Sequence, residues 1–129
     1  MKILLAGDTK LSGNIIHTLL QNRHSITVLN TDMDYCQQLA DQYEELTVLN
    51  ADNTDIVTLE EANVKKFDSV IAVSDYDSVN FVFCQLCKDL FGIKRLAAII
   101  NCPGNAEIFR KLGVDILIDK NSYFLSCIG

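Results

Sequence analysis

The sequence predicts a doubly wound α/β fold with six parallel strands in the order 3-2-1-4-5-6. Short apolar runs, typical of strands buried on both faces, alternate with segments of helical periodicity, and the connections between them are short. Because crossovers between parallel strands are right-handed, strands separated by helices in this way cover both faces of one sheet. Two such halves place a ligand crevice at the carboxyl ends of the first and fourth strands.

The first strand and helix are clearly marked. Ile3–Ala6 is an apolar run that predicts a buried strand, and it ends in the glycine-containing loop Gly7–Gly13. A helix is predicted at about Leu11–Gln21, because apolar residues recur there at helical spacing. Free backbone N–H groups and the positive end of the helix dipole converge in such a loop, which therefore favours a phosphate group.

The remaining elements alternate in the same way. β-branched residues predict a second strand at Ser25–Asn30, and Asp32 or Asp34 can cap the helix after it. Further strands are predicted at Thr47–Leu49, Ser69–Val73, Leu96–Ile100 and Val114–Ile118. Further helices are predicted at Asp55–Ala62, Asp75–Phe91, Asn105–Leu112 and Asn121–Ile128.

Composition excludes several classes of protein. The 129 residues suit one domain, and 49% hydrophobic residues are enough for an ordinary core. A net charge of −6 and the absence of a basic stripe argue against unaided binding to nucleic acid or to an anionic membrane. Lys2 leads directly into a short strand, and no apolar run approaches the ~20 residues that a membrane span needs. We therefore expect a cytosolic protein.

The five cysteines do not predict a disulfide framework or a metal site. Their number is odd and they are scattered through apolar segments, which suits a reducing compartment. Cys84 and Cys87 form a CxxC pair, but they lie within a predicted helix, whereas a redox pair opens a helix. The two histidines lack ligand spacing. We expect buried core cysteines and no metal.

The loop after the first strand is an imperfect dinucleotide fingerprint. Such a fingerprint would place glycines at 7, 9 and 12, where this chain has Gly7, Thr9 and Ser12, with Gly13 one step late. Asn30 ends the second strand, 23 residues after Gly7, where an Asp or Glu would hold the ribose hydroxyls of NAD. An amide can accept from one hydroxyl and donate to the other, but it lacks the charge-assisted bond of a carboxylate.

Four stretches of the chain carry a family resemblance. They are KILLAG at 2–7, NADNTD at 50–55, AVSDYDSVN at 72–80 and NCPGNAEIFRKLGVD at 101–115. Together they resemble the Rossmann-like nucleotide-binding lobe of the RCK or TrkA-N family, cytoplasmic regulators of potassium channels and transporters. The resemblance covers nearly the whole chain and implies one domain over residues 1–129, with 119–129 the start of a crossover or interface helix.

The resemblance also implies a set of binding residues. Phosphates would lie against Gly7, Asp8, Thr9, Lys10, Leu11, Ser12 and Gly13. The ribose would lie against Asn30 and Thr31, with Asp32 beside them, and the adenine side against Asp52 and Asn53. The floor of the cleft would be Ala72, Val73, Ser74, Asp75 and Asn80. No catalytic residue is implied.

Departures from the family pattern bear on the ligand. Thr9 adds a β-branched side chain where a pyrophosphate would approach the backbone, and Asp8 places a carboxylate beside the same phosphates. Both disfavour a long dinucleotide. Lys10 and the hydroxyls of Thr9 and Ser12 could still hold one or a few phosphates. The sequence therefore favours AMP, ADP or ATP over NAD, and a decayed, empty site is the alternative.

Two other classes of function, an oxidoreductase and a receiver domain, fit the sequence less well. An NAD(P)-binding oxidoreductase needs a substrate domain and a proton donor beyond the nucleotide fold. A phosphoacceptor receiver domain would suit Asp52, Ser74 and Pro103, but Mg²⁺ needs an acidic pair after the first strand, where only Asp8 occurs. A receiver also expects a lysine where this chain has Asn101 and Cys102.

We therefore expect a non-catalytic regulatory subunit or domain that gates the membrane subunit of a potassium channel or transporter. It would lie in the cytoplasm, peripheral to the inner membrane through that partner, without binding nucleic acid. A homo-oligomer, either a dimer or a ring of dimers, is expected because an apolar cluster follows the sixth strand. The cluster consists of Tyr123, Phe124, Leu125, Cys127 and Ile128.

Overall fold

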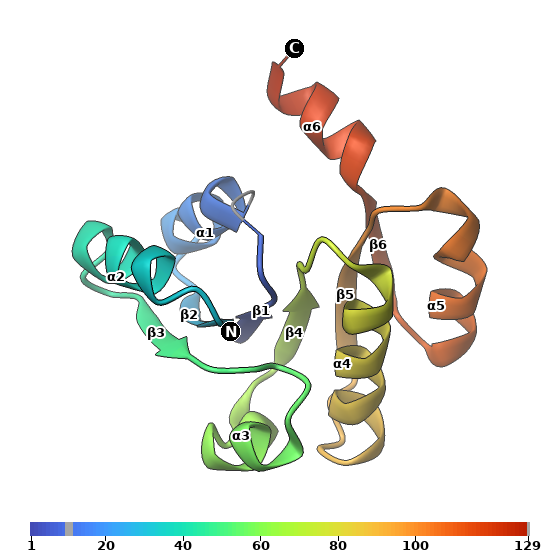
Figure 1. Cartoon of the computed structure of the whole chain (residues 1–129), viewed down its shortest axis with the longest axis horizontal. Coiled ribbons are helices and arrows are strands. Elements are labelled where there is room, and N and C mark those ends of the chain that lie inside the picture. The colour runs from blue at the N-terminus through green and yellow to red at the C-terminus, as the bar shows by residue number, and fades with distance from the viewer. Residues whose placement is uncertain (10–11, 129) are drawn as a thin grey trace.

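The computed structural model describes residues 1–9 and 12–128. Over these residues the chain forms a parallel six-stranded sheet in the order β3-β2-β1-β4-β5-β6 (Figure 1). The predicted fold class is therefore confirmed, and the order differs from that of a five-stranded receiver domain. The strands are β1 (Lys2–Ala6), β2 (Ser25–Asn30), β3 (Thr47–Asn50), β4 (Ser69–Ala72), β5 (Arg95–Ile100) and β6 (Ile116–Asp119).

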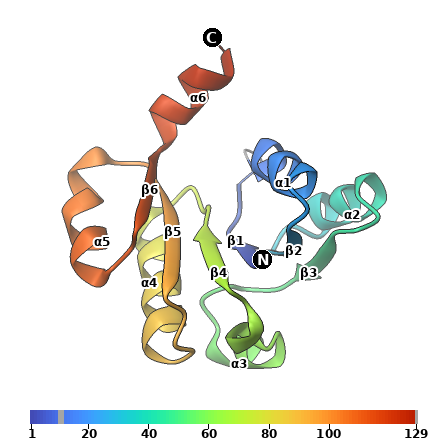
Figure 2. The same ribbon diagram turned by 180° about the vertical axis from the view of Figure 1, so that it is seen from behind.

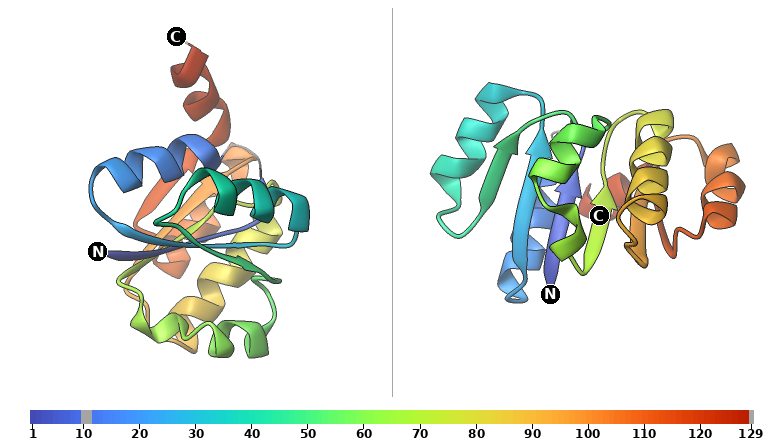
Figure 3. Two further views of the ribbon diagram at one scale, coloured as in Figure 1. Left: turned by 90° about the vertical axis from the view of Figure 1, so that its left-hand side faces the viewer. Right: turned by 90° about the horizontal axis from the view of Figure 1, so that it is seen from below.

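Helices cover both faces of the sheet, as the two views in Figure 3 show. Alternate residues of β1 point to opposite faces: Ile3 and Leu5 pack with α1 and α2, whereas Leu4 and Ala6 pack with α3, α4 and α5. This explains why the strand is apolar at every one of these positions. The helices are α1 (Ser12–Gln21), α2 (Met33–Gln42), α3 (Ile56–Glu61), α4 (Asp77–Asp89), α5 (Ala106–Leu112) and α6 (Lys120–Ile128), with short 3₁₀ turns η1 (Val64–Lys66) and η2 (Pro103–Asn105).

Helix ends follow local hydrogen bonding. Asp32 caps α2 by accepting a hydrogen bond from the Tyr35 N–H at 3.1 Å, as predicted. The sixth strand starts two residues later than predicted, at Ile116. Val114 instead closes α5, because its N–H donates to the Phe109 carbonyl at 3.0 Å. The helix predicted from Asp75 likewise begins only at Asp77.

Helix α6 leaves the body of the domain. It begins directly after β6 and projects away from the sheet and the other helices (Figures 1 and 2). Leu125 and Ile128 are exposed on it. The side chains of Tyr123, Phe124 and Cys127, which belong to the predicted apolar cluster, lie outside what the structure describes. Within the described residues, none of the helices is both long enough and apolar enough to cross a bilayer.

The CxxC pair lies in the core, as predicted. Cys84 and Cys87 are fully buried on α4 and pack against the sheet. Burial raises the pKa of the Cys84 thiol to about 12, so it remains protonated and unreactive at neutral pH. Burial, with a smaller effect of Cys84, also raises the pKa of Cys87. These thiols therefore serve as packing groups.

Candidate functional site

The carboxyl ends of β1 and β4 meet closely because residue 7 is a glycine. Gly7 has a φ of +133°, and a Cβ there would lie 2.4 Å from the Ser74 backbone nitrogen. Its N–H donates to the Leu29 carbonyl of β2 at 3.1 Å. A side chain at this position would push β1 away from β4. Gly7 therefore fixes the base of the crevice at the point where the strand order reverses.

Asn30 braces the end of β2 from inside. It is 2% exposed, its Nδ2 donates to the Gly7 carbonyl at 3.2 Å, and its Oδ1 accepts from the Asp32 N–H at 2.8 Å. Its backbone carbonyl also accepts from the Asn50 side chain at 3.1 Å. Asn30 therefore joins the ends of three strands, and both ends of its amide are engaged within the protein.

Asp8 presents its carboxylate to the end of β2. One oxygen accepts from the Thr31 N–H at 2.8 Å, and the other accepts from the Thr31 hydroxyl. Both residues are exposed at the sheet edge. The sequence placed Asp8 beside phosphates, whereas in the structure it is directed toward the neighbouring strand. A carboxylate thus stands at the end of β2 after all, but it comes from the loop that follows β1.

The loop predicted to hold phosphates, residues 7–13, includes a buried threonine and the first turn of α1. Thr9 is buried, at 6% exposed, so its branched side chain packs into the protein. Gly13 lies in the first turn of α1, and nothing lies within 4 Å of the position where its Cβ would be. Lys10 and Leu11, both predicted phosphate contacts, lie outside the described residues, as does the side chain of Ser12.

The loop after β3 contributes two different polar groups. Asp52 is exposed, and its Oδ1 accepts from the Thr54 N–H at 2.9 Å and from the Thr54 hydroxyl at 2.8 Å. Asn53 is 6% exposed, and its buried Nδ2 has no hydrogen-bond partner among the described residues. A buried donor of this kind is costly unless a ligand or a water molecule accepts from it.

Asn80 supports the floor of the cleft at the end of β4. It is fully buried, its Oδ1 accepts from the Ser74 N–H at 2.8 Å, and its Nδ2 donates to the carbonyls of Ser74 at 2.9 Å and Ile99 at 3.0 Å. Ala72 and Val73 are buried in the same region, and the Val73 N–H donates to the Ala6 carbonyl at 2.8 Å. These buried residues hold the ends of β1, β4 and β5 together.

Asp77, which is not among the predicted site residues, holds the end of β5. Its carboxylate accepts from the Asn101 N–H at 2.7 Å, the Asn101 side chain at 2.9 Å, the Cys102 N–H at 2.9 Å and the Asn105 side chain at 2.9 Å. Partial burial alone would raise the pKa of this carboxyl. The four hydrogen bonds outweigh that effect and hold the pKa below its usual range.

An ion pair joins the cleft to α6. Lys120, the first residue of α6, lies 3.1 Å from Asp75, which follows β4. The two side chains are 30% and 47% exposed, so the pair is partly screened by solvent. It links the segment that follows β4 to the base of the projecting helix.

The predicted residues therefore divide into two groups. Eight of them are buried and shape the edge: Gly7, Thr9, Asn30, Asn53, Ala72, Val73, Ser74 and Asn80. Five are exposed at it: Asp8, Thr31, Asp32, Asp52 and Asp75. Comparison with models of known protein families shows which family the chain belongs to. The model of the TrkA-N domain matches residues 3–120.

The chain belongs to the TrkA-N family. A Trk system potassium uptake protein TrkA homolog from Methanothermobacter thermautotrophicus is 28% identical over 118 residues, which cover 92% of this chain and 54% of that protein. This TrkA-N chain spans about half the length of the curated relatives it matches.

Solved structures show the same fold. The channel GsuK bound to ADP superimposes with a TM-score of 0.77 at 24% identity, covering 91% of this TrkA-N chain and 30% of that one. GsuK bound to NAD superimposes with a TM-score of 0.76 at 24% identity, covering 91% of this chain and 21% of that one. At this identity the likeness shows the fold alone.

Proposed function

We propose that this TrkA-N chain is the nucleotide-sensing regulatory lobe of a potassium uptake system. The observation that carries the proposal is the carboxyl edge of the sheet, where an exposed Asp8 carboxylate faces Thr31 between the ends of β1 and β2, beside the reversal of strand order at β1 and β4. Family membership supports the potassium system, since matching relatives are named as Trk system potassium uptake proteins.

The ligand we propose is an adenine nucleotide, with AMP, ADP or ATP preferred over NAD. The Asp8 carboxylate already accepts two hydrogen bonds and has lone pairs left for ribose hydroxyls. The unpartnered Asn53 donor could serve the adenine side, and α1 offers its N-terminus to phosphates. That GsuK has been solved with ADP and with NAD supports an adenine nucleotide as the class of ligand.

The lobe would act by binding rather than by catalysis. A ligand that binds one arrangement of an assembly more tightly than another shifts the assembly toward that arrangement. The affected partner would be the membrane subunit of a potassium channel or transporter, with this lobe on the cytoplasmic side and assembled as a dimer or a ring of dimers. An oxidoreductase would need a substrate domain and a proton donor in addition to this lobe.

Calorimetry tests the proposal. AMP, ADP and ATP should each bind, and Asp8→Asn should weaken adenosine and ADP by roughly tenfold, since a charge-assisted bond to ribose is lost. The matched control is Asp89→Asn, which removes the same charge from an exposed position near the end of α4. It should bind as the parent does.

Three outcomes would each contradict a part of the proposal. If no adenine nucleotide binds at millimolar concentration, the nucleotide-sensing function is wrong. If NADH binds tenfold or more tightly than all three mononucleotides, the preference for a short ligand is wrong. Tighter binding of ADP by Asp8→Asn would mean that Asp8 acts on the phosphates by repulsion and does not hold the ribose.

A further inference from the structure

Lys120 brings a positive charge to the carboxyl ends of the strands. It is the first residue of α6 and directly follows β6. The other lysines and arginines that the structure describes lie in the last turns of helices, in the connections from a helix to the next strand, or at the first residue of a strand. Helices of this fold run back from the carboxyl ends of the strands to their starts, so those places lie toward the opposite edge.

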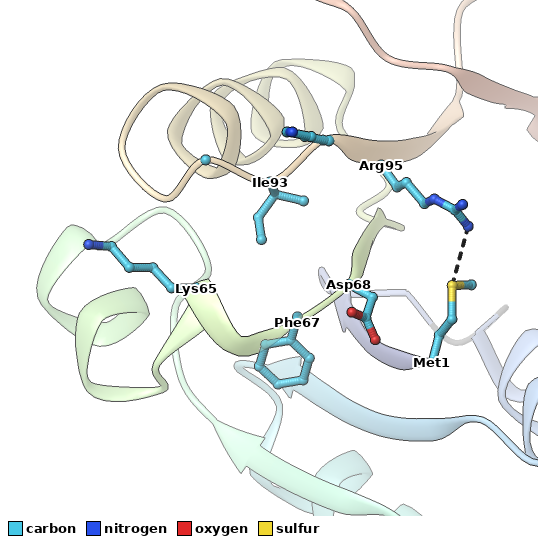
Figure 4. Close-up of a pocket in the computed structure, with 8 residues that line it drawn as sticks. Met1, Lys65, Phe67, Asp68, Ile93 and Arg95 are labelled. Atoms are coloured by element: carbon cyan, nitrogen blue, oxygen red, sulfur yellow. Dashed lines mark hydrogen bonds between the residues drawn. The ribbon is translucent and has the colours of Figure 1, made fainter.

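The opposite edge includes a pocket beside the starts of β4 and β5 (Figure 4). Lys65 and Arg95 lie on opposite sides of this pocket, and Asp68 also lines it. The Arg95 guanidinium donates to the Met1 sulfur at 3.4 Å. These cations do not converge on one position. Among the described residues, Lys120 is therefore the cation that a ligand at the carboxyl ends would meet.

The ammonium of Lys120 lies beside the segment that follows β4, although its backbone belongs to the edge of the sheet. β5 separates β6 from β4 in the strand order, yet Lys120 Nζ lies 3.1 Å from Asp75 Oδ1. Asp75 follows Ser74, whose backbone nitrogen lies 2.4 Å from the position of a Cβ on Gly7. The Lys120 side chain thus reaches across the end of β5 toward the loop predicted to hold phosphates.

Asp75 is a weak partner for this ammonium. The two side chains are 30% and 47% exposed, and exposed pairs of this kind contribute little to stability because solvent screens them. A phosphate group carries more negative charge than a carboxylate. A phosphate near this position would therefore attract Lys120 more strongly than Asp75 does, and it would repel the Asp75 carboxylate.

The base of α6 is held independently of the ion pair. Asp119 Oδ1 accepts hydrogen bonds from the Asn121 N–H at 2.8 Å and from the Ser122 N–H at 3.2 Å, so it caps the first turn of the helix. Lysine carries its charge on a flexible four-carbon stem. Lys120 can therefore change partner by rotation of its side chain while the backbone of the first turn stays in place.

We propose that Lys120 binds a phosphate group of the nucleotide and that this phosphate replaces Asp75 as its partner. The inference rests on the proposed function and deepens it, because it assigns recognition of the charged part of the ligand to the first residue of α6. Asp75 competes with the phosphate for Lys120. The pair thereby sets how strongly the site prefers nucleotides to adenosine.

Calorimetry of the whole chain with adenosine, ADP and ATP tests the inference. Lys120→Gln should weaken ADP and ATP roughly tenfold through loss of a charge-assisted contact, and it should leave adenosine unchanged. Lys120→Arg should retain most of the affinity, because it keeps the charge. Asp75→Asn should tighten ADP and ATP roughly threefold by removing the competing carboxylate, and this gain should be smaller when Lys120→Gln is also present.

The matched control breaks the ion pair within α5. Lys111→Gln and Glu107→Gln remove the same two charges and should leave all three affinities unchanged. The inference is overturned if Lys120→Gln binds ADP and ATP as the parent does, if it loses adenosine to the same extent, if Lys111→Gln weakens the nucleotides equally, or if Asp75→Asn leaves both affinities unchanged. In these outcomes the parent still binds adenine nucleotides, so the proposed function stands. A parent that binds none of the three ligands overturns both.

Discussion

At the scale of single residues, two side chains stand where the nucleotide-binding fingerprint has one carboxylate: Asn30 at the fingerprint position and Asp8 beside Thr31. Asn30 occupies the fingerprint position but is turned inward, with Nδ2 on the Gly7 carbonyl. We predict that Asn30→Asp, which restores the fingerprint, destabilises the domain by about 1–3 kcal/mol, since a carboxylate oxygen then faces that carbonyl. Chemical denaturation measures this effect. A variant as stable as the parent and tighter for adenosine would contradict it.

The same residues show where sequence reasoning succeeds and where it stops. The position of Asn30 at the end of β2 follows from strand periodicity, so the sequence could predict it. Its orientation depends on the Gly7 carbonyl, which accepts from its Nδ2 and lies 23 residues earlier in the chain, just after β1. The bond between Asp8 and Thr31 is equally non-local. The sequence could thus identify residues at the site but not the direction of their side chains.

At the scale of elements, Asp77 connects α4 to the end of β5 and to η2. Four hydrogen bonds stabilise its charged form. We predict that Asp77→Asn lowers the free energy of unfolding at pH 7 by about 1–3 kcal/mol, since the new amide nitrogen opposes donors that the carboxylate accepted. Urea denaturation measures it, with Asp89→Asn as the exposed control.

The effect of Asp77 should depend on pH with a defined sign. Its pKa is lowered in the folded protein from the usual 3.8, so its stabilisation is present above that value. It is lost as the pH falls from there through the folded pKa. The difference between parent and Asp77→Asn should therefore be constant from pH 7 to about 5 and shrink below about 4. A difference that grows toward acid pH would contradict this assignment.

Element boundaries show the same limit of local reasoning. The alternation of strands and helices was predictable because their interiors are almost purely apolar or clearly periodic. The late start of β6 was not, because Val114 and Asp115 pair with Phe109 and Leu96 through backbone bonds that periodicity does not encode. The stretch 101–105 is part of the family resemblance. Asn101, Cys102 and Asn105 in it donate hydrogen bonds to the Asp77 carboxylate, which explains why this stretch needs hydrogen-bond donors.

At the scale of the whole molecule, α6 is the element with the least support from its own domain. It projects beyond the body of the domain (Figure 2). Leu125 and Ile128 are exposed on it, and Lys120 at its base forms an ion pair with Asp75, which follows β4. A short helix with exposed apolar side chains gains stability when a second surface covers it. We therefore propose that residues 119–129 form the start of a subunit interface.

Removing residues 122–129 tests this proposal on the assembly. We predict that the parent is at least dimeric at micromolar concentration and that the shortened chain has a smaller assembly mass, while its unfolding transition is retained, because α6 projects away from the rest of the domain. Sedimentation velocity measures the mass. Leu125→Ser with Ile128→Ser should give the same loss while keeping the helix length, whereas Val57→Ser on α3, another exposed apolar position, should not. A monomeric parent, or a shortened chain with the full assembly mass, would show that α6 does not join subunits.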